Sequence, residues 1–221
     1  VSSDNEEVML RNKLEHSDYL AHLGNYKDFV ARLNPLIDNH IKKHPHAQPV
    51  VVSDGAEWIE TWQSKCYPNA KVILDFYHAA EKLCEFATLV FSSSKNKDQW
   101  VAKRKAELLE GQVEKVILAI RTKALGRRCS IIEKAEAVIQ YYQKNSYRME
   151  YNEYRKAGYC IGSGAIESAI STVVQQRCKL VGQRWTQRVE AVLNLRAAFK
   201  SGKGEGIRRI IDAQMGHPWA A

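Results

Sequence analysis

VVVSDGAEWIETWQSKCYPNAKVILDFYH, residues 50–78, contains two short apolar runs that each end at an acidic residue. The runs VVV and VIL are apolar and rich in β-branched residues, which is typical of strands buried on both faces of a parallel sheet. Between them, Trp58, Ile59 and Trp62 recur at helical spacing, and Tyr-Pro-Asn at 67–69 ends the helix predicted over residues 56–66. The stretch therefore predicts a strand–helix–strand unit with a right-handed crossover.

Acidic side chains follow both predicted strands. Asp54 comes directly after the first and Asp75 directly after the second. Because open α/β sheets bind their ligands at the carboxyl ends of the strands, both residues are candidates for a functional site. Asp75 could orient His78, which could in turn position a phosphate or an attacking water. The alternative is that Asp75 caps the helix that starts near His78.

Size and composition indicate a folded chain. The sequence has 221 residues, 45% of them hydrophobic, so a sizeable core is expected. No apolar run reaches membrane-spanning length, and we expect a cytoplasmic protein with no membrane partner. The five cysteines are an odd number and include no CxxC pair, which argues against a disulfide framework or a cysteine zinc site.

The positive charge is concentrated near the carboxyl end. The net charge is +8, and residues 168–221 hold nine basic and three acidic residues. This excess favours a polyanionic partner, although a solvated helix face would have the same composition.

The remaining segments are predicted to be mostly helical. We expect an edge strand at 8–14, helices at 25–44 and 78–91, a linker at 92–98, and a helical region over 99–157 with a break at 126–128. Further helices are expected at 165–180, 186–201 and 207–214. Five tyrosines between 141 and 154 could stack on bases, but helix packing would also explain them.

A second carboxylate could join Asp54. Glu167 follows a Gly-Ser-Gly turn, in the first turn of the helix predicted at 165–180. Carboxylates that converge at strand ends hold hard divalent cations such as Mg²⁺, and a pair of such ions can promote an in-line phosphoryl displacement. The alternative is that Glu167 only stabilises the helix N-terminus.

Several motifs in order resemble one family. The chain resembles the C-terminal catalytic part of bacterial insertion-sequence transposases of the DDE type, in the group related to Mutator-like elements. The motifs that carry the resemblance are, in chain order, SDGAEWI, YPNA, ILDFYHAAEKL, GSGAIESA, VVQQRCKLVGQRWT and NLRAAF. The resemblance extends over residues 19–200. It implies an α/β, RNase H-like (retroviral-integrase-like) core interrupted by an all-helical insertion.

The resemblance also implies roles for single residues. Asp54 would be the second acidic residue of the catalytic triad and Glu167 the third, together holding Mg²⁺ or Mn²⁺. Asp75 and His78 match the family's C/D-x-x-H motif. The partner would be DNA, both transposon ends and target, bound by a homo-oligomer in the bacterial nucleoid. Residues after Glu167 are expected to contact this DNA, with Trp185 either stacking on a base or anchoring the core; they are Gln175, Arg177, Lys179, Arg184, Trp185 and Arg188.

If the resemblance holds, the chain has four parts. Residues 1–91 would be a partial RNase H-like core, 92–157 the helical insertion, 158–201 the catalytic-Glu helix with its return to the core, and 202–221 a basic tail. The family's first catalytic Asp lies on the first strand of the sheet, and we expect that strand to precede Val1. Asp4 and Asp18 are the alternatives within the chain, and neither follows a convincing buried strand.

Three other interpretations remain open. The chain could be an RNase H-like nuclease that cuts without joining, or an inactive DNA-binding remnant of a transposase. It could also be a helical interaction module in which the acidic residues are helix caps.

Overall fold

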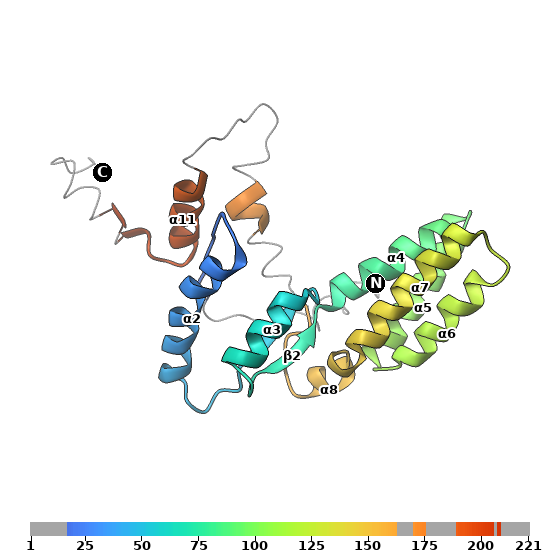
Figure 1. Cartoon of the computed structure of the whole chain (residues 1–221), viewed down its shortest axis with the longest axis horizontal. Coiled ribbons are helices and arrows are strands. Elements are labelled where there is room, and N and C mark those ends of the chain that lie inside the picture. The colour runs from blue at the N-terminus through green and yellow to red at the C-terminus, as the bar shows by residue number, and fades with distance from the viewer. Residues whose placement is uncertain (1–16, 163–169, 176–188, 206, 209–221) are drawn as a thin grey trace, which may run out of the picture. The chain divides into compact units, whose positions relative to one another are not determined.

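The computed structural model describes residues 17–162, 170–175, 189–205 and 207–208. Its contacts divide the chain into two compact units. The first, called here the sheet-and-bundle unit, covers the described residues 48–162. The second, called the α2–α11 unit, covers the described residues 17–47 and those from 170 onward. Figure 1 shows the elements of both.

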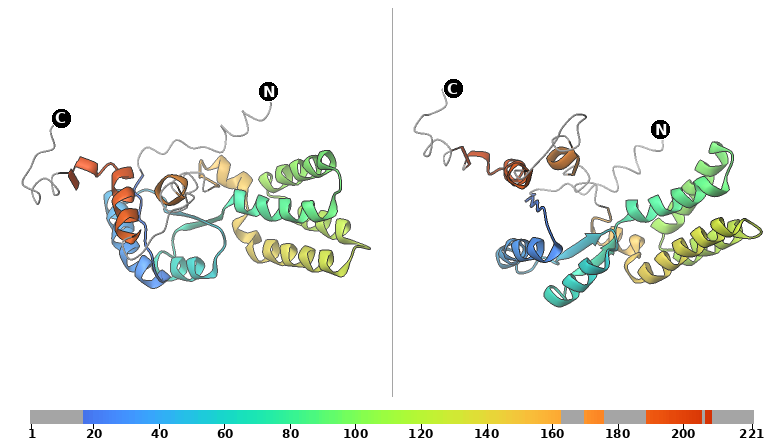
Figure 2. Two further views of the ribbon diagram at one scale, coloured as in Figure 1. Left: turned by 90° about the horizontal axis from the view of Figure 1, so that it is seen from above. Right: turned by 45° about the horizontal axis from the view of Figure 1, so that its top comes forward.

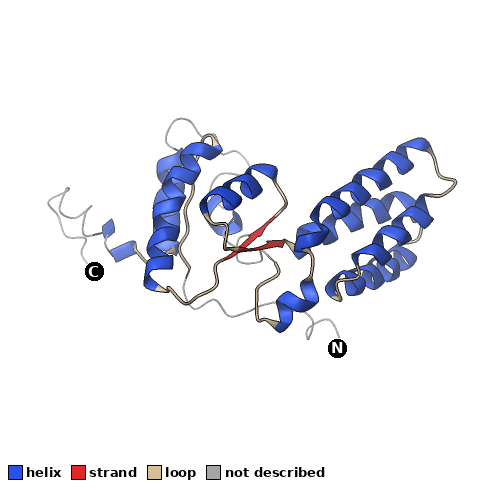
Figure 3. Cartoon of the chain, turned by 60° about the horizontal axis from the view of Figure 1, so that its bottom comes forward, coloured by secondary structure: helices blue, strands red, loops and turns tan. Residues whose placement is uncertain are grey.

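The predicted strand–helix–strand stretch is confirmed. Strand β1 (Val50–Ser53) pairs in parallel with β2 (Lys71–Leu74), with Ser53 opposite Leu74. Helix α3 (Glu57–Cys66) connects them. Figure 3 shows the two strands in red, lying side by side. The described part of the chain is otherwise mostly helical, so the architecture fits a broad α/β class.

Four helices that pack against one another follow the sheet. They are α4 (Phe76–Val90), α5 (Ser94–Leu109), α6 (Val113–Ala124) and α7 (Cys129–Asn145). Helix α4 contacts α5 and α7, and α6 contacts the same two, which closes a bundle (Figure 2). The short helices η1 (Ser146–Arg148) and α8 (Tyr151–Lys156) come next in the chain.

One hydrophobic core joins the strands to the bundle. It contains Ile73 and Leu74 of β2 together with buried side chains of all four bundle helices. Tyr142, Tyr151 and Tyr154 are also buried in it, and the Tyr142 hydroxyl donates to the carbonyl oxygen of Ala79 at 2.7 Å. These three tyrosines therefore serve helix packing, as the alternative to base stacking proposed.

Two predictions about the bundle were wrong. Residues 92–98 are not a linker, because the Ser93 side chain caps α5 and the helix begins at Ser94. A second break, at residues 110–112, separates α5 from α6, with Gly111 at a φ of 72°. The predicted break at 126–128 is present between α6 and α7.

The α2–α11 unit is built on two long helices. Helix α2 (Tyr26–Lys43) contains Pro35 and is capped by the Asn25 side chain, as the helix predicted at 25–44 required. Helix α11 (Val189–Lys200) packs against η2 (Ile170–Gln175), a π-helical turn, through Val173, Leu193 and Ala197. The strand predicted at 8–14 lies outside the described residues. In the part that is described, no helix combines the length and apolar character needed to cross a membrane.

Candidate functional site

Each of the two strands is followed by an acidic residue, and both strands end at the same edge of the sheet. Ser53 is opposite Leu74, and the Asp75 N–H donates to the Ser53 carbonyl oxygen at 2.8 Å. The backbone pairing thus continues to Asp75, the residue between β2 and α4. Asp54 and Asp75 are therefore brought together, as expected from the carboxyl ends of parallel strands.

Asp54 lies in a turn that needs glycine at the next position. Its Oδ1 accepts from the Ala56 N–H at 3.0 Å, and the residue is exposed. Gly55 has a φ of 91°, and a Cβ placed there would lie 3.0 Å from a methyl group of Leu74. The turn presents the Asp54 carboxylate to solvent while its backbone stays close to the core.

Asp75 is a helix cap. Its Oδ1 accepts from the N–H groups of Tyr77 at 2.8 Å and His78 at 3.4 Å, at the start of α4. The residue is only 4% exposed. His78 is in the first turn of the same helix, and its Nδ1 lies 3.4 Å from Glu81 Oε2. The capping alternative for Asp75 is thus confirmed.

Tyr141 of α7 also lies at this edge of the sheet. The sequence had indicated it only as one of a cluster of tyrosines. Its hydroxyl donates to the Asp54 carbonyl oxygen at 3.1 Å, and its ring lies 6.4 Å from the His78 ring, centroid to centroid. Burial raises the pKa of Tyr141, and the carboxylates of Asp54 and Asp75 raise it further, against the opposing effect of Arg148. The phenol therefore remains a neutral donor at physiological pH.

A buried arginine lies behind the Asp54 turn. Arg148 is 1% exposed; its Nε donates to Asn145 Oδ1 at 2.9 Å, and its Nη2 donates to the same oxygen. Glu60 of α3 is 3.7 Å from Nη2. Nη1 is buried and has no hydrogen-bond partner among the described residues. No sequence pattern singled out Arg148, because charged residues at helix ends are usually solvated.

Polar contacts from the end of the bundle also reach helix α3. Lys144 is paired with Glu57, and the Tyr147 hydroxyl donates to Glu60 at 2.7 Å. The hydrogen bond from Lys144 lowers the pKa of Glu57, and the positive charge of Lys144 adds to this effect. Residues 141–148 therefore contact both the Asp54 turn and the helix that follows it.

The described residues alone do not form a complete metal site. Across the described ranges, no three His, Cys, Asp or Glu side chains come together closely enough to hold a metal ion. Asp54 supplies an exposed carboxylate, whereas the Asp75 carboxylate is buried and engaged with the helix backbone. Glu167, the predicted second ligand, lies outside the described residues.

The predicted DNA-contacting set lies mostly outside the structure's described part. Gln175 is exposed at the end of η2. The positions of the others are not described; they are Arg177, Lys179, Arg184, Trp185 and Arg188.

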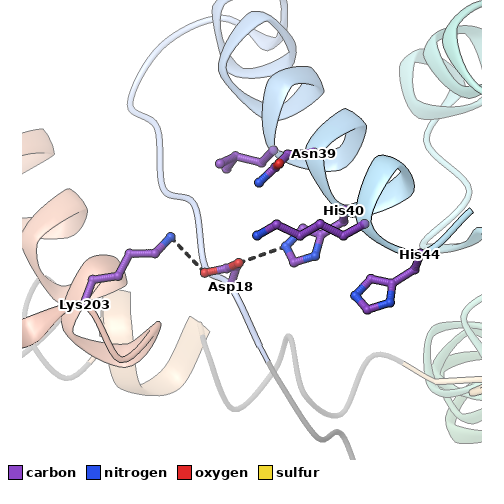
Figure 4. A pocket seen from close by; sticks show the side chains of 7 residues that line it. Asp18, Asn39, His40, His44 and Lys203 are labelled. Atoms are coloured by element: carbon purple, nitrogen blue, oxygen red, sulfur yellow. Dashed lines mark hydrogen bonds and ion pairs between the residues drawn. The ribbon is translucent and has the colours of Figure 1, made fainter.

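A pocket of about 480 Å³ occurs in the α2–α11 unit (Figure 4). Asp18 lies at its wall, where its Oδ2 is 2.9 Å from His40 Nε2 and its Oδ1 is 2.9 Å from Lys203 Nζ. The first contact links the segment before α2 to α2 itself, and the second links it to the segment after α11. Asp18, an alternative for the first catalytic Asp, is thus held between two basic side chains.

Comparison with known proteins gives no relative for this chain: no family model, curated protein or solved structure matches it.

Replacing Asp75 separates the capping role from a role that needs charge. Asp75→Ala is expected to lower the free energy of unfolding by about 1–2 kcal/mol, because two helix N–H groups lose their acceptor. Asp75→Asn should retain most of the stability, since an amide oxygen can accept the same bonds. Urea unfolding of the three proteins measures this. Equal losses in both variants would show that the carboxylate charge, and not the cap, stabilises the fold.

Proposed function

We propose that this chain is the catalytic part of a DDE-type DNA transposase with an RNase H-like core. The observation that supports this best is the parallel pairing of β1 and β2, which brings Asp54 and Asp75 to one edge of the sheet. An exposed carboxylate at the carboxyl end of a sheet strand is what phosphoryl-transfer sites of this kind require. The choice of family rests on the sequence motifs from SDGAEWI to NLRAAF, which occur in the order expected for these transposases.

In this proposal, Asp54 and Glu167 hold Mg²⁺ or Mn²⁺. The bound ions would activate the attacking oxygen and stabilise the leaving oxygen of a DNA phosphodiester. The remaining ligand would come from the family's first Asp. The residues of this chain orient the edge: Asp75 fixes the start of α4, and with it His78, while the Tyr141 hydroxyl holds the Asp54 carbonyl.

Charge supports DNA as the substrate. The chain has a net charge of +8, and its last 54 residues are strongly basic. A negatively charged metal-binding edge would repel a phosphate backbone, so basic surfaces elsewhere are needed to bind it.

A nicking and joining assay tests the proposal. We expect the natural protein to cut supercoiled plasmid DNA and to join a 3′-hydroxyl end to it, only when Mg²⁺ or Mn²⁺ is present. Asp54→Asn should abolish both products. Glu136→Gln, a control at an exposed position of α7 outside the candidate site, should leave both unchanged.

Activity that persists in Asp54→Asn would contradict the proposed role of this edge. Cutting without joining would instead indicate an RNase H-like nuclease. Metal-independent DNA binding without either product would indicate an inactive remnant.

A further inference from the structure

Two loops meet at the end of the helical bundle that lies away from the sheet. One joins α4 to α5 and the other joins α6 to α7 (Figures 1 and 2). The Arg127 Nη2 donates to the Val90 carbonyl oxygen at 3.4 Å, and the Lys123 ammonium lies 5.0 Å from the centre of the Phe91 ring. These contacts place residues 88–98 beside residues 121–132, and the two segments together are called here the bundle tip.

The bundle tip is strongly basic. It contains one acidic residue, Asp98, and six basic ones, so that its net charge is +5; the basic residues are Lys95, Lys97, Arg121, Lys123, Arg127 and Arg128. All of them are exposed or half-buried. Within the described chain, the one ion pair recorded for these six is that of Lys97 with Asp98, at 4.0 Å. Most of the charge is therefore left uncompensated.

Helix dipoles explain only part of this charge. Arg121 and Lys123 lie in the last turn of α6, where cations are favourable. Lys95 and Lys97 lie in the first turn of α5, and Arg128 is the residue before α7. Neither helix has an acidic residue in its first turn. Cations at helix N-termini are unfavourable because the N-terminal end of the helix dipole is positive, so this arrangement costs stability unless an anion is bound.

The chemistry of the tip fits the phosphate backbone of a nucleic acid. Three of the six cations are arginines, whose planar guanidinium groups match phosphate oxygens in pairs. Leu125 is the most exposed apolar side chain of the loop, at 77%, and the cations around it are better suited to phosphates than to an extended apolar surface.

One helix links the tip to the candidate site. Asp75 caps the N-terminus of α4, and this helix of 15 residues ends in the tip. That length is about 22 Å, or roughly six to seven base pairs of duplex. We propose that the bundle tip binds DNA phosphates about 22 Å from the Asp54 edge, so that one duplex contacts both. This inference rests on the proposed function for its choice of DNA.

Charge reversal tests the tip. The assay is fluorescence anisotropy of a labelled 30-base-pair duplex, titrated with the full chain at several salt concentrations in the presence of EDTA. The tip variant is Arg121→Glu/Arg128→Glu, because neither side chain makes a recorded contact that folding would lose. The matched control is Lys65→Glu/Lys103→Glu, which changes the charge equally on exposed positions of α3 and α5 outside the tip.

The tip variant is expected to bind DNA roughly ten- to a hundredfold more weakly at 0.1 M salt, with the salt slope reduced by about two, because two phosphate contacts are lost. The control should bind within about threefold of the unmodified chain. If the glutamates disturb folding, as judged by circular dichroism, Arg121→Gln/Arg128→Gln gives the same comparison without charge reversal.

Several outcomes would overturn the inference. These are unchanged DNA affinity in the tip variant, equal losses in the tip variant and the control, or loss of binding to phosphatidylserine vesicles while DNA affinity is unchanged. Because the binding assay uses EDTA, its result is independent of catalysis. The two proposals can therefore fail separately. If the unmodified chain does not cut DNA but the tip variant binds DNA more weakly than the control, the proposed transposase activity is contradicted and DNA binding by the tip is still supported.

Discussion

Replacing Arg148 with alanine is expected to lower the free energy of unfolding of the sheet-and-bundle unit by about 3–5 kcal/mol. The guanidinium is almost completely buried, and two of its nitrogens donate to the amide oxygen of Asn145. Alanine would leave that buried oxygen without its donors and would open a cavity behind the Asp54 turn. It would also remove the charge next to Glu60.

Methionine at position 148 separates these contributions. Arg148→Met fills most of the volume but supplies no donor, so we expect a smaller loss of about 1–3 kcal/mol from the unsatisfied Asn145 oxygen. Urea unfolding followed by circular dichroism measures both variants. An Arg148→Ala protein within 1 kcal/mol of the unmodified chain would mean that the arginine contributes little net stability. A methionine variant as unstable as the alanine variant would show that volume is not the cause.

The elements around Asp54 could be predicted because each has a local signal. The apolar runs before Asp54 and Asp75 are short and rich in β-branched residues, and they form the two strands of the described sheet. The helix between them ends where Tyr67 and Pro68 follow Cys66. The same pattern could not decide between a catalytic and a capping role for Asp75, since a carboxylate before a helix serves both.

The errors in the bundle have two local causes. Serine and lysine at 92–98 are typical of a linker, yet Ser93 supplies the cap that starts α5. The apolar stripe continues across Gly111, with Leu108 before it and Val113 after it, so the period of the pattern did not reveal the turn between α5 and α6. Gly111 has the positive φ that a helix end requires, and a glycine inside a predicted helix was the available signal.

The candidate site was predictable only in its strand-end residues. Asp54 and Asp75 lie close in sequence to the strands that place them, whereas Tyr141 of α7 and Arg148 of η1 follow Asp54 by about 90 residues in the chain. Their positions depend on how the bundle packs back against α3, and no periodicity carries that information. A buried arginine is also rare enough that sequence alone favours a solvated one.

Replacing Ile120 with alanine is expected to lower the free energy of unfolding by about 2–5 kcal/mol. Ile120 lies on α6 in the core cluster that also contains Ile73 and Leu74 of β2. Because the strands and the bundle bury their side chains in one core, the loss should reach the sheet. Leu118→Ala is the matched control on the same helix; its side chain is 65% exposed, and its loss should change stability by less than about 0.5 kcal/mol.

Hydrogen exchange shows whether the sheet and the bundle unfold together. In Ile120→Ala, we expect amide protection in β1 and β2 to fall in parallel with that in α6, because sub-global opening of one core exposes both. Protection that falls in α6 while the strands keep theirs would mean that the bundle unfolds independently. In that case, the Asp54 edge would survive without the helices, and Tyr141 and Arg148 could not be what holds it in place.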